Sequence, residues 1–424
     1  MVLLAVGTPT RQVVSVAYSI LRAVTADTGG TAANEPAQPG LLRDLNERTV
    51  LDTIRRLPGV NRAEVARQTG LSKPTVSLAL RTLEDNGLVR PQTAAPAGRV
   101  GVLFEAVPDA ALGAGVELTD RSVRAVVVDL EGQVVARAEV PFGRSGSREG
   151  VDRALRRCLD ELRSALPPGR SPDCLVMGTP GIIDPVTGVV TQAGAATALD
   201  GSVPRLDVGG LAGVPVQVLN DVDLAALGER SEGAAQDVDD FAVLWVGAGT
   251  GAALVLNGRL HRGVRGAAGE VAGVPFAAAV AATGGTPHEF AAAGPTEEAV
   301  VELASRHAGR EVASDAGALL DAALLGDPLG QLVVDEVARW VAWYVASVAA
   351  VVDPEMVVLS GSLGAHASLV APVRQHVAGL LHAPVQVVAS KLGDASVLIG
   401  AATVARLTAA DLVFARRVRE RGRG

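Results

Sequence analysis

Cysteine, aromatic residues and long apolar segments are all scarce in this chain of 424 residues. Two cysteines, Cys158 and Cys174, supply neither a disulfide framework nor a cysteine-rich zinc site. Aromatic residues make up only 3 % of the sequence, so the core has to be built from alanine, valine and leucine. The longest strongly apolar segment, Trp340 to Val352, is shorter than the roughly 18 residues of a membrane-spanning helix. With no positively charged start typical of a signal peptide, these absences predict a cytoplasmic protein without a membrane partner.

Acidic residues also outnumber basic ones, but the two kinds are unevenly distributed along the chain. The formal net charge of −8 excludes a uniformly basic nucleic-acid-binding chain. Residues 41–107 nevertheless carry a net charge of +3, whereas residues 108–424 carry −11. A mildly basic module joined to an acidic body is typical of a protein that contacts DNA through one end only.

Two short helices around a tight turn are predicted where residues 61–81 read N-R-A-E-V-A-R-Q-T-G-L-S-K-P-T-V-S-L-A-L-R. Asn61 is a suitable N-cap, and Glu64 three residues later completes a capping box. Gly70 supplies the chain reversal, and Ser72 is the N-cap of the second helix. This order of capping and turn residues is typical of a helix-turn-helix.

The second helix is expected to span residues 72–86 and to bury one face. At helical spacing, the inner face carries Val76, Ala79, Leu80 and Leu83. The outer face and its flanks mix hydrogen-bond donors, cations and one apolar residue, which suits a helix lying in a major groove. The predicted DNA contacts of the two helices are Arg62, Ser72, Lys73, Thr75, Ser77, Leu78 and Arg81. The alternative is an ordinary helical hairpin inside a core.

A helical pattern at residues 41–57 precedes this unit, and two short strands are predicted between residues 88 and 107. Three helices followed by a small hairpin form a winged helix, so residues 41–107 are the predicted DNA-binding domain. Arg99 at the hairpin tip is a candidate for a minor-groove contact, with a solvated loop cation as the alternative. Residues 1–40 are expected to be disordered, because their Gly/Pro/Ala/Asn-rich part has little to bury.

From residue 108 onward, apolar strands alternate with helices. This alternation predicts a layered α/β body, and two such halves around a cleft suit its length. The predicted body covers residues 108–410. Residues 411–424 are predicted to be a basic C-terminal tail. Its segment 416–423 is expected to be a solvated, frayed end, with a supplementary phosphate contact to DNA as the alternative.

Five segments in chain order carry motifs that occur together in one known family. The winged-helix segment is similar to R-A-E-L-A-R-x-T-G-L-S-x-P-T-V-S, and residues 178–188 are similar to G-x-P-G-x-x-D-x-x-x-G. Residues 220–229 are similar to N-D-x-N-x-x-A-L-G-E, residues 246–270 resemble V-G-T-G-x-G…D-G-x…G-A-A-G-E, and residues 359–364 are similar to a nucleotide-side glycine turn. The chain thus resembles the ROK family of repressors, open reading frames and kinases, in its repressor form. The resemblance implies an α/β fold: an N-terminal winged helix-turn-helix, then an actin-like (ribonuclease H-like) body of two lobes with a sugar cleft.

One departure from the family concerns phosphate binding. The resemblance places the D-x-G-G-T motif of active family kinases at Glu117-Leu-Thr-Asp-Arg121. The glycines of that motif expose backbone N–H groups to phosphate, whereas side chains fill the turn here and Asp120 adds a negative charge. We therefore predict that the chain is not an enzyme. Asp221, which matches the general base of the kinases, is expected to bond a ligand rather than to catalyse.

The second departure concerns zinc. The resemblance implies a zinc site of one histidine and three cysteines, in G-E-x-G-H and C-x-C-G-x-x-G-C-x-E. Gly273 stands where the histidine belongs, and residues 283–290 keep glycines and Glu289 but contain no cysteine. We therefore expect no metal and no cofactor, and an ordinary loop role for His288.

The sugar site that the resemblance implies retains Asn220, Asp221, Glu270 and Glu289. An amide and three carboxylates can share paired hydrogen bonds with the hydroxyl groups of a polyol. The alternative for Asn220 and Asp221 is a helix cap, and strand-end or cap roles also stand open for the two glutamates.

Three hypotheses follow. The favoured one is a DNA-binding transcriptional regulator, a repressor of sugar uptake or catabolism genes. It would act as a homodimer or homotetramer on double-stranded operator DNA, with a sugar or sugar derivative as effector in the cleft. The second is an active ROK sugar kinase with a regulatory head. The third is a ROK regulator that has lost sugar binding.

Overall fold

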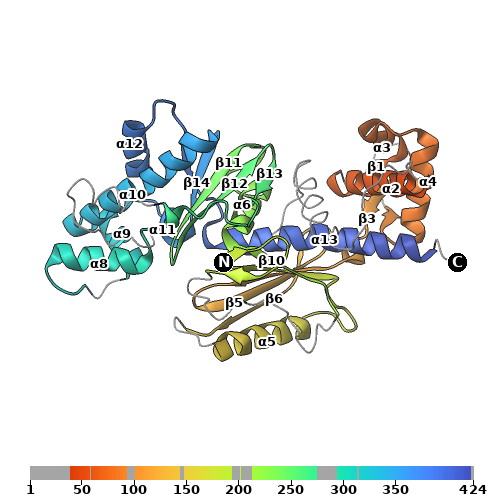
Figure 1. The fold of residues 1–424 in the computed structure, drawn as a ribbon. Coiled ribbons are helices and arrows are strands. Elements are labelled where there is room, and N and C mark those ends of the chain that lie inside the picture. The colour runs from red at the N-terminus through yellow and green to blue at the C-terminus, as the bar shows by residue number, and fades with distance from the viewer. Residues whose placement is uncertain are drawn as a thin grey trace.

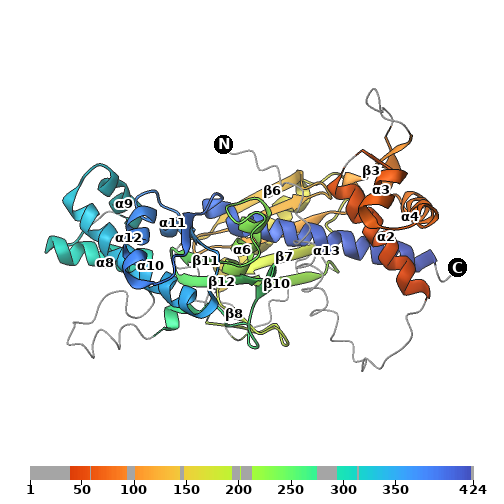
Figure 2. The same cartoon turned by 90° about the horizontal axis from the view of Figure 1, so that it is seen from above.

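The computed structural model describes residues 39–57, 59–92, 101–143, 148–192, 201, 213–274, 294–312 and 315–421. Within these ranges, a small N-terminal head lies at one end of a body made of two lobes (Figure 1). The longest helix, near the C-terminus, runs from between the lobes to the head (Figures 1 and 2).

The head is a winged helix. Its described residues form helices and a small sheet of strand order β1-β3-β2. The helices are α2 (Pro39–Arg56), α3 (Arg62–Thr69) and α4 (Lys73–Asp85), and the strands are β1 (Val60–Asn61), β2 (Val89–Pro91) and β3 (Leu103–Ala106). The strand β1, which pairs with β3, was not predicted.

The local signals in the sequence set the helix ends of the head. The side chain of Asn61 accepts a hydrogen bond from the backbone N–H of Glu64 at 2.9 Å, and the hydroxyl of Ser72 caps α4. Gly70 closes α3 with φ +72°, a left-handed conformation that favours glycine. The four residues predicted to form the inner face of α4 are at most 2 % exposed. The predicted helix-turn-helix is therefore confirmed.

The first lobe is built on a five-stranded sheet of order β10-β7-β4-β5-β6. Strands β4, β5 and β6 pair antiparallel, and β7 and β10 extend the sheet in parallel. Helix α5 (Arg148–Ser164) packs against one face, and a β8–β9 hairpin follows β7 (Figure 1). The strands are β4 (Gly113–Leu118), β5 (Ser122–Val128), β6 (Val134–Pro141), β7 (Cys174–Thr179), β8 (Ile182–Ile183), β9 (Val190–Thr191) and β10 (Val216–Asn220), and the 3₁₀ turn η1 (Pro108–Ala110) leads into β4.

The second lobe repeats this topology, with the strand order β13-β12-β11-β14-β15. A core of its own lies between that sheet and the helices on its outer side. The strands are β11 (Phe241–Val246), β12 (Thr250–Leu256), β13 (Arg259–His261), β14 (Met356–Ser360) and β15 (Gln386–Ala389). The helices are α8 (Glu297–Ala308), α9 (Ala316–Leu324), α10 (Pro328–Val352), α11 (Gly361–Gly364) and α12 (Val370–Leu380), with 3₁₀ turns η3 (Val271–Gly273) and η5 (Gly393–Ala395). Two lobes of one topology confirm the predicted actin-like α/β body.

Two helices join the parts of the molecule. Helix α6 (Asp221–Ser231) packs against strands of both lobes and against α13 (Ser396–Arg421). Helix α13 then continues beneath the head, and one apolar cluster includes residues of the head, the first lobe and α13. Head and body therefore share a continuous core.

Helix α13 is long and apolar enough to cross a membrane by length and composition, yet 83 % of its apolar window is buried inside the protein. Residues 416–423 were predicted to be a solvated end of the tail, and for the described part this is wrong. The helix runs on to Arg421, and Arg416 bonds the carboxylate of Asp173 at 2.8 Å. Its neighbour Arg417 bonds backbone carbonyl groups of the head and of η1. The many arginines of this segment led to the prediction of a solvated tail. The carbonyl groups at the end of a helix need hydrogen-bond donors, however, and Arg417 supplies one to the end of α4.

Candidate nucleic-acid interface and interlobe cleft

The outer face of α4 presents a mixed polar and apolar surface. Lys73 and Arg81 are exposed, and Leu78 on the same helix is 50 % exposed. Thr75 and Ser77 are half-buried on the flanks of this face. A cation, a hydroxyl group and an aliphatic side chain on one exposed helix face match what base edges in a major groove offer.

Three of the predicted DNA contacts also have partners within the protein. The hydroxyl of Ser72 lies 2.7 Å from that of Thr75 and accepts from the backbone N–H of Thr75. Arg62 lies over the ring of Phe104 in β3, with 5.5 Å from guanidinium carbon to ring centroid. Arg62 is therefore positioned where the first helix of the motif meets the wing. Arg99 lies outside the described residues.

Arg43 was missed by the sequence analysis. From α2 it donates to the hydroxyl of Thr82 on α4 at 3.1 Å, and to the carboxylate of buried Glu47 at 2.9 Å. Its side chain is 56 % exposed, so it adds a cation beside the recognition face. No short-range signal could have found it, because the two residues are 39 positions apart.

The C-terminal end of α4 is held by the last turns of α13. Arg417 donates from Nη1 to the carbonyl of Asn86 at 2.7 Å, and from Nη2 to that of Ala110 at 3.1 Å. Arg48 of α2 pairs with Asp411 of α13 at 3.1 Å. Because helix-terminal carbonyl groups lack partners within the helix, Arg417 both caps α4 and fixes its orientation on the body.

We expect Arg417→Ala to loosen the head on the body, with a loss of about 1.5–3 kcal/mol for hydrogen bonds from a charged donor. Hydrogen exchange measured by mass spectrometry should speed up in residues 80–88, while strands of the second lobe stay protected. Arg416→Ala, which removes a pair to Asp173 of the first lobe and no bond to α4, is the matched control and should leave exchange in residues 80–88 unchanged. Equal protection of residues 80–88 in both variants would contradict this role of Arg417.

The structure places Asn220 and Asp221 at the junction of β10 and α6, between the lobes. The Asn220 side chain accepts from the backbone N–H of Asp223 at 3.0 Å and donates to the carbonyl of Gly181 at 3.0 Å. Asn220 therefore caps α6 and ties it to the loop after β7. This is the capping role that the sequence left open, and the side chain keeps a second N–H for a ligand.

Carboxylates gather beside this cap. Burial raises the pKa of Asp221 to about 6, and nearby Glu270 pushes it in the same direction. Burial also raises the pKa of Asp223 to about 7, although Arg262 opposes this from 3.3 Å. Arg262 donates further to the carbonyl of Ile183, so it joins β13, α6 and the β8–β9 hairpin. The cluster can accept hydrogen bonds from hydroxyl groups and, near neutral pH, can also donate them.

The free energy of unfolding should fall as the pH rises from about 4 to 7. Carboxyl pKa values that are higher in the folded than in the unfolded chain make the folded protein bind more protons between about pH 4 and 7. Asp221→Asn removes one such group, so we expect it to stabilise the protein by roughly 2 kcal/mol at pH 8. About a third of this gain should remain at pH 4.5, because the unfolded carboxyl group, with a pKa near 3.9, is already mostly ionised there. Urea unfolding at both pH values measures this, with Asp152→Asn on exposed α5 as control, and a gain independent of pH would contradict it.

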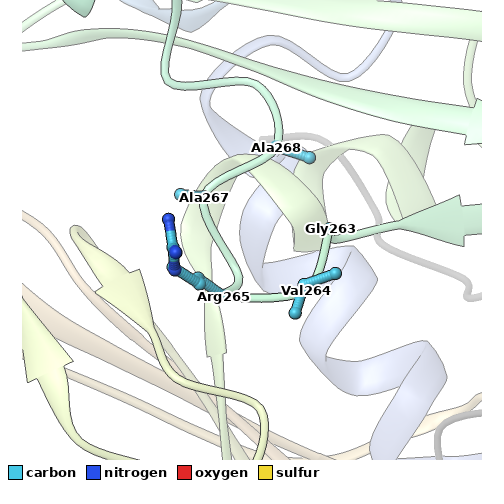
Figure 3. Close-up of a pocket in the computed structure, with 5 residues that line it drawn as sticks. All are labelled: Gly263, Val264, Arg265, Ala267 and Ala268. Carbon is cyan, nitrogen blue, oxygen red and sulfur yellow. The ribbon is translucent and has the colours of Figure 1, made fainter.

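A loop after β13 borders an open hollow of about 460 Å³ (Figure 3). The loop is shaped by glycine: Gly266 and Gly269 have positive φ, and a Cβ on either would overlap a backbone carbonyl oxygen, of Ile183 or of Ala252. Neither Asp221 nor Glu270 is among the described residues that line the hollow, namely Gly263, Val264, Arg265, Ala267 and Ala268. Exposed Glu270 follows directly on this loop. Glu289 lies outside the described residues, so three of the four predicted sugar contacts can be placed.

The β4–β5 turn, where the resemblance places phosphate binding, is occupied by side-chain interactions. Glu117 is 4 % exposed and pairs with Arg124 at 2.7 Å. Burial raises the pKa of Glu117 to about 7, against the opposing effect of Arg124. Arg121 reaches across to Glu297 of the second lobe at 2.7 Å.

The residues present do not fit the zinc site of the family. Both cysteines lie in the first lobe, where their thiol groups face the carbonyls of Val123 and Ala405. Burial raises the pKa of both thiols to about 12, which disfavours the thiolate form that binds zinc. Gly273, at the position of the family's histidine, offers no ligand.

These features define a class: a winged-helix DNA-binding head on a two-lobed, actin-like body. A family model described as "ROK family" matches residues 113–407, and one described as "Winged helix-turn-helix DNA-binding" matches residues 43–90. The chain belongs to the ROK family.

Relatives include both repressors and kinases. The xylose repressor of Bacillus subtilis (strain 168) is 26 % identical over 243 residues, which are 55 % of this chain and 61 % of that protein. This chain therefore matches less than two thirds of the length of that repressor. A glucokinase of Halalkalibacterium halodurans is 26 % identical over 282 residues, 62 % of this chain and 84 % of that enzyme. A solved ROK family transcriptional regulator, described as a homolog of the E. coli MLC protein, superposes with a TM-score of 0.73 over 89 % of this chain and 99 % of its own, at 20 % identity.

Proposed function

We propose that the protein is a transcriptional repressor of sugar uptake or catabolism genes, with a sugar or sugar derivative as effector in the interlobe cleft. The observation that carries the proposal is the exposed recognition face of α4, with Lys73, Leu78 and Arg81, on a head that shares its core with a ROK body. The repressor name of one relative supports the DNA-binding role and the link to sugar metabolism.

The arrangement of two helices supports control of DNA binding by the cleft. Helix α6 begins at the Asn220–Asp221 cap and packs closely along α13, where Gly228 faces the backbone of Ser396. Helix α13 ends against the recognition helix through Arg417. A ligand that prefers one arrangement of the lobes would thereby change the position of the head, and only such a preference can shift DNA affinity.

The second candidate is a sugar kinase, which the glucokinase relative favours. We propose instead that phosphoryl transfer is lost and that no metal or cofactor is needed. The support is the β4–β5 turn, where Glu117 is paired with Arg124 and the side chains of Asp120 and Arg121 stand where backbone N–H groups would have to meet phosphate. Asp221 would then keep only a binding role.

We further propose a cytoplasmic homodimer or homotetramer that binds inverted repeats, because two-fold protein symmetry is mirrored in paired half-sites. The third hypothesis is a regulator whose cleft binds no sugar. It is one of the outcomes that calorimetry with sugars can give.

Selection of bound genomic fragments by the purified chain tests the DNA role and should enrich fragments beside sugar transport or catabolism genes. Calorimetry with a panel of hexoses, pentoses and amino sugars should show heat with the parent and much less with Glu270→Ala. Heat with neither protein would favour the third hypothesis. Robust sugar-dependent ATP consumption in a coupled assay would favour the kinase.

A further inference from the structure

Two arginines, one in strand β5 and one in the turn before it, bond residues outside the first-lobe sheet. Arg121 donates from Nη2 to Glu297 at the start of α8, at 2.7 Å. Arg124 donates from Nη2 to the backbone carbonyl of Asp394 in η5, also at 2.7 Å. Both acceptors lie in segments outside the first-lobe sheet, so each contact bridges separate parts of the body.

The contact at Glu297 is a network rather than an isolated pair. The other oxygen of Glu297 accepts from the hydroxyl of Ser362 in α11 at 2.7 Å, and its backbone N–H bonds the carbonyl of Gly247. On the first-lobe side, Arg121 also bonds Asp120 at 3.2 Å. The β4–β5 turn, α8, α11 and the end of β11 are therefore linked through one residue, Glu297.

The second bridge is anchored in a buried position. The Arg124 guanidinium lies between the carboxylate of Glu117, which is 4 % exposed, and the carbonyl of Asp394, two residues before α13 begins. Removing Arg124 would leave the Glu117 carboxylate buried without its cation, which is costly. Strand β5 is thus fastened to the entrance of the helix that carries the head.

We infer that Arg121 and Arg124 form an internal clasp that holds the two lobes closed without a bound nucleotide. The clasp occupies the turn at which a phosphate group would need exposed backbone N–H groups. The guanidinium group of Arg121 joins the first lobe to α8 of the second lobe, and that of Arg124 joins the first-lobe sheet to the segment leading into α13. The interlobe equilibrium is then set by residues of the chain together with whatever occupies the sugar side of the cleft. The body therefore responds to one ligand rather than two.

The test measures the distance between the lobes in the full-length protein. Spin labels are attached at Arg153→Cys on α5 and Gln331→Cys on α10, both exposed positions. The native cysteines are at most 2 % exposed and stay unlabelled. Double electron–electron resonance should give a single distance population for the parent, unchanged by ATP and magnesium.

Arg121→Ala should add a longer-distance population that the parent keeps below roughly 10 %. The charge exchange Arg121→Glu with Glu297→Arg should restore the single population, since it rebuilds the pair with reversed sign. Arg137→Ala, an exposed arginine on β6, is the matched control and should leave the profile of the parent.

An Arg121→Ala profile that superimposes on that of the parent would overturn the clasp, as would a charge exchange that stays as broad as the single variant. Narrowing of the parent profile by ATP and magnesium would overturn the claim that closure needs no nucleotide. Arg121 is half-exposed in a turn, so Arg121→Ala should fold as the parent does, and near-ultraviolet circular dichroism checks this. Because the readout needs neither DNA nor sugar, its failure is distinguishable from failure of the proposed function.

Discussion

Alanine at Arg81 should weaken binding to a selected operator fragment by about 5- to 150-fold, because a bidentate arginine–guanine contact contributes about 1–3 kcal/mol. Arg81 is exposed on the outer face of α4, opposite the buried Leu80 and Leu83. Fluorescence anisotropy with a labelled duplex at fixed salt measures the change. Arg156→Ala, an exposed arginine on α5, is the matched control and should bind like the parent.

Substitutions of neighbouring residues should distinguish contacts to phosphate groups from contacts to base edges. Lys73→Ala should weaken binding to all sequences and lower the salt dependence by about one unit in slope, as expected for a phosphate contact. Substitutions of Thr75 or Leu78 should instead change which sequence is preferred, since these side chains suit base edges. Glu270→Ala should leave affinity for DNA unchanged in the absence of sugar. Unchanged affinity and preference in all the head variants would remove the assignment of α4 as the recognition helix.

Gly400→Ala should lower the free energy of unfolding by about 3 kcal/mol, at the upper end of the typical cost of overpacking. A Cβ at this position of α13 would overlap the carbonyl oxygen of Leu224 in α6, and backbone atoms of two packed helices have little room to move. The midpoint of thermal unfolding should fall by roughly 6–12 °C, at about 2–4 °C per kcal/mol. Since α13 also carries the head, operator binding should weaken at temperatures where the parent still binds.

Gly379→Ala is the matched control for this substitution. Gly379 also lies in a helix, α12, but its Cβ would meet open space. Replacing a helical glycine by alanine there should leave stability unchanged or raise it by up to ~1 kcal/mol. Similar losses in both variants would contradict the close contact of α6 and α13.

Features fixed by neighbours in the sequence could be predicted. The caps at Asn61 and Ser72, the buried face of α4 and most strands of both lobes follow from local periodicity and turn residues. The helix-cap role of Asn220 was also readable, because an Asn-Asp pair before an apolar helix is a strong N-terminal signal. The strands β8, β9, β13 and β15, of two to four residues each, are too short to show a period of two and were missed.

Features fixed by distant partners could not be predicted. Helix α13 packs against both α6 and the first-lobe sheet, so its apolar residues are spread around the helix and give little amphipathic signal. Arg417 contacts Asn86, which is 331 positions away, and Arg121 contacts Glu297, which is 176 positions away. The residue types predicted a solvated tail, which is wrong, and a turn filled by side chains, but they could not predict which partners those side chains bond. Contacts in the folded chain decide both.

The central claim is that the winged-helix head binds a specific DNA duplex, and that the two-lobed body binds the effector and thereby controls this binding. The most direct measurement is the ratio of affinities of the folded, full-length protein for a selected genomic duplex and for random-sequence competitor at near-physiological salt. The account predicts a preference of about 10³-fold or more, as specific DNA-binding proteins show. Equal affinity for the two duplexes would contradict it.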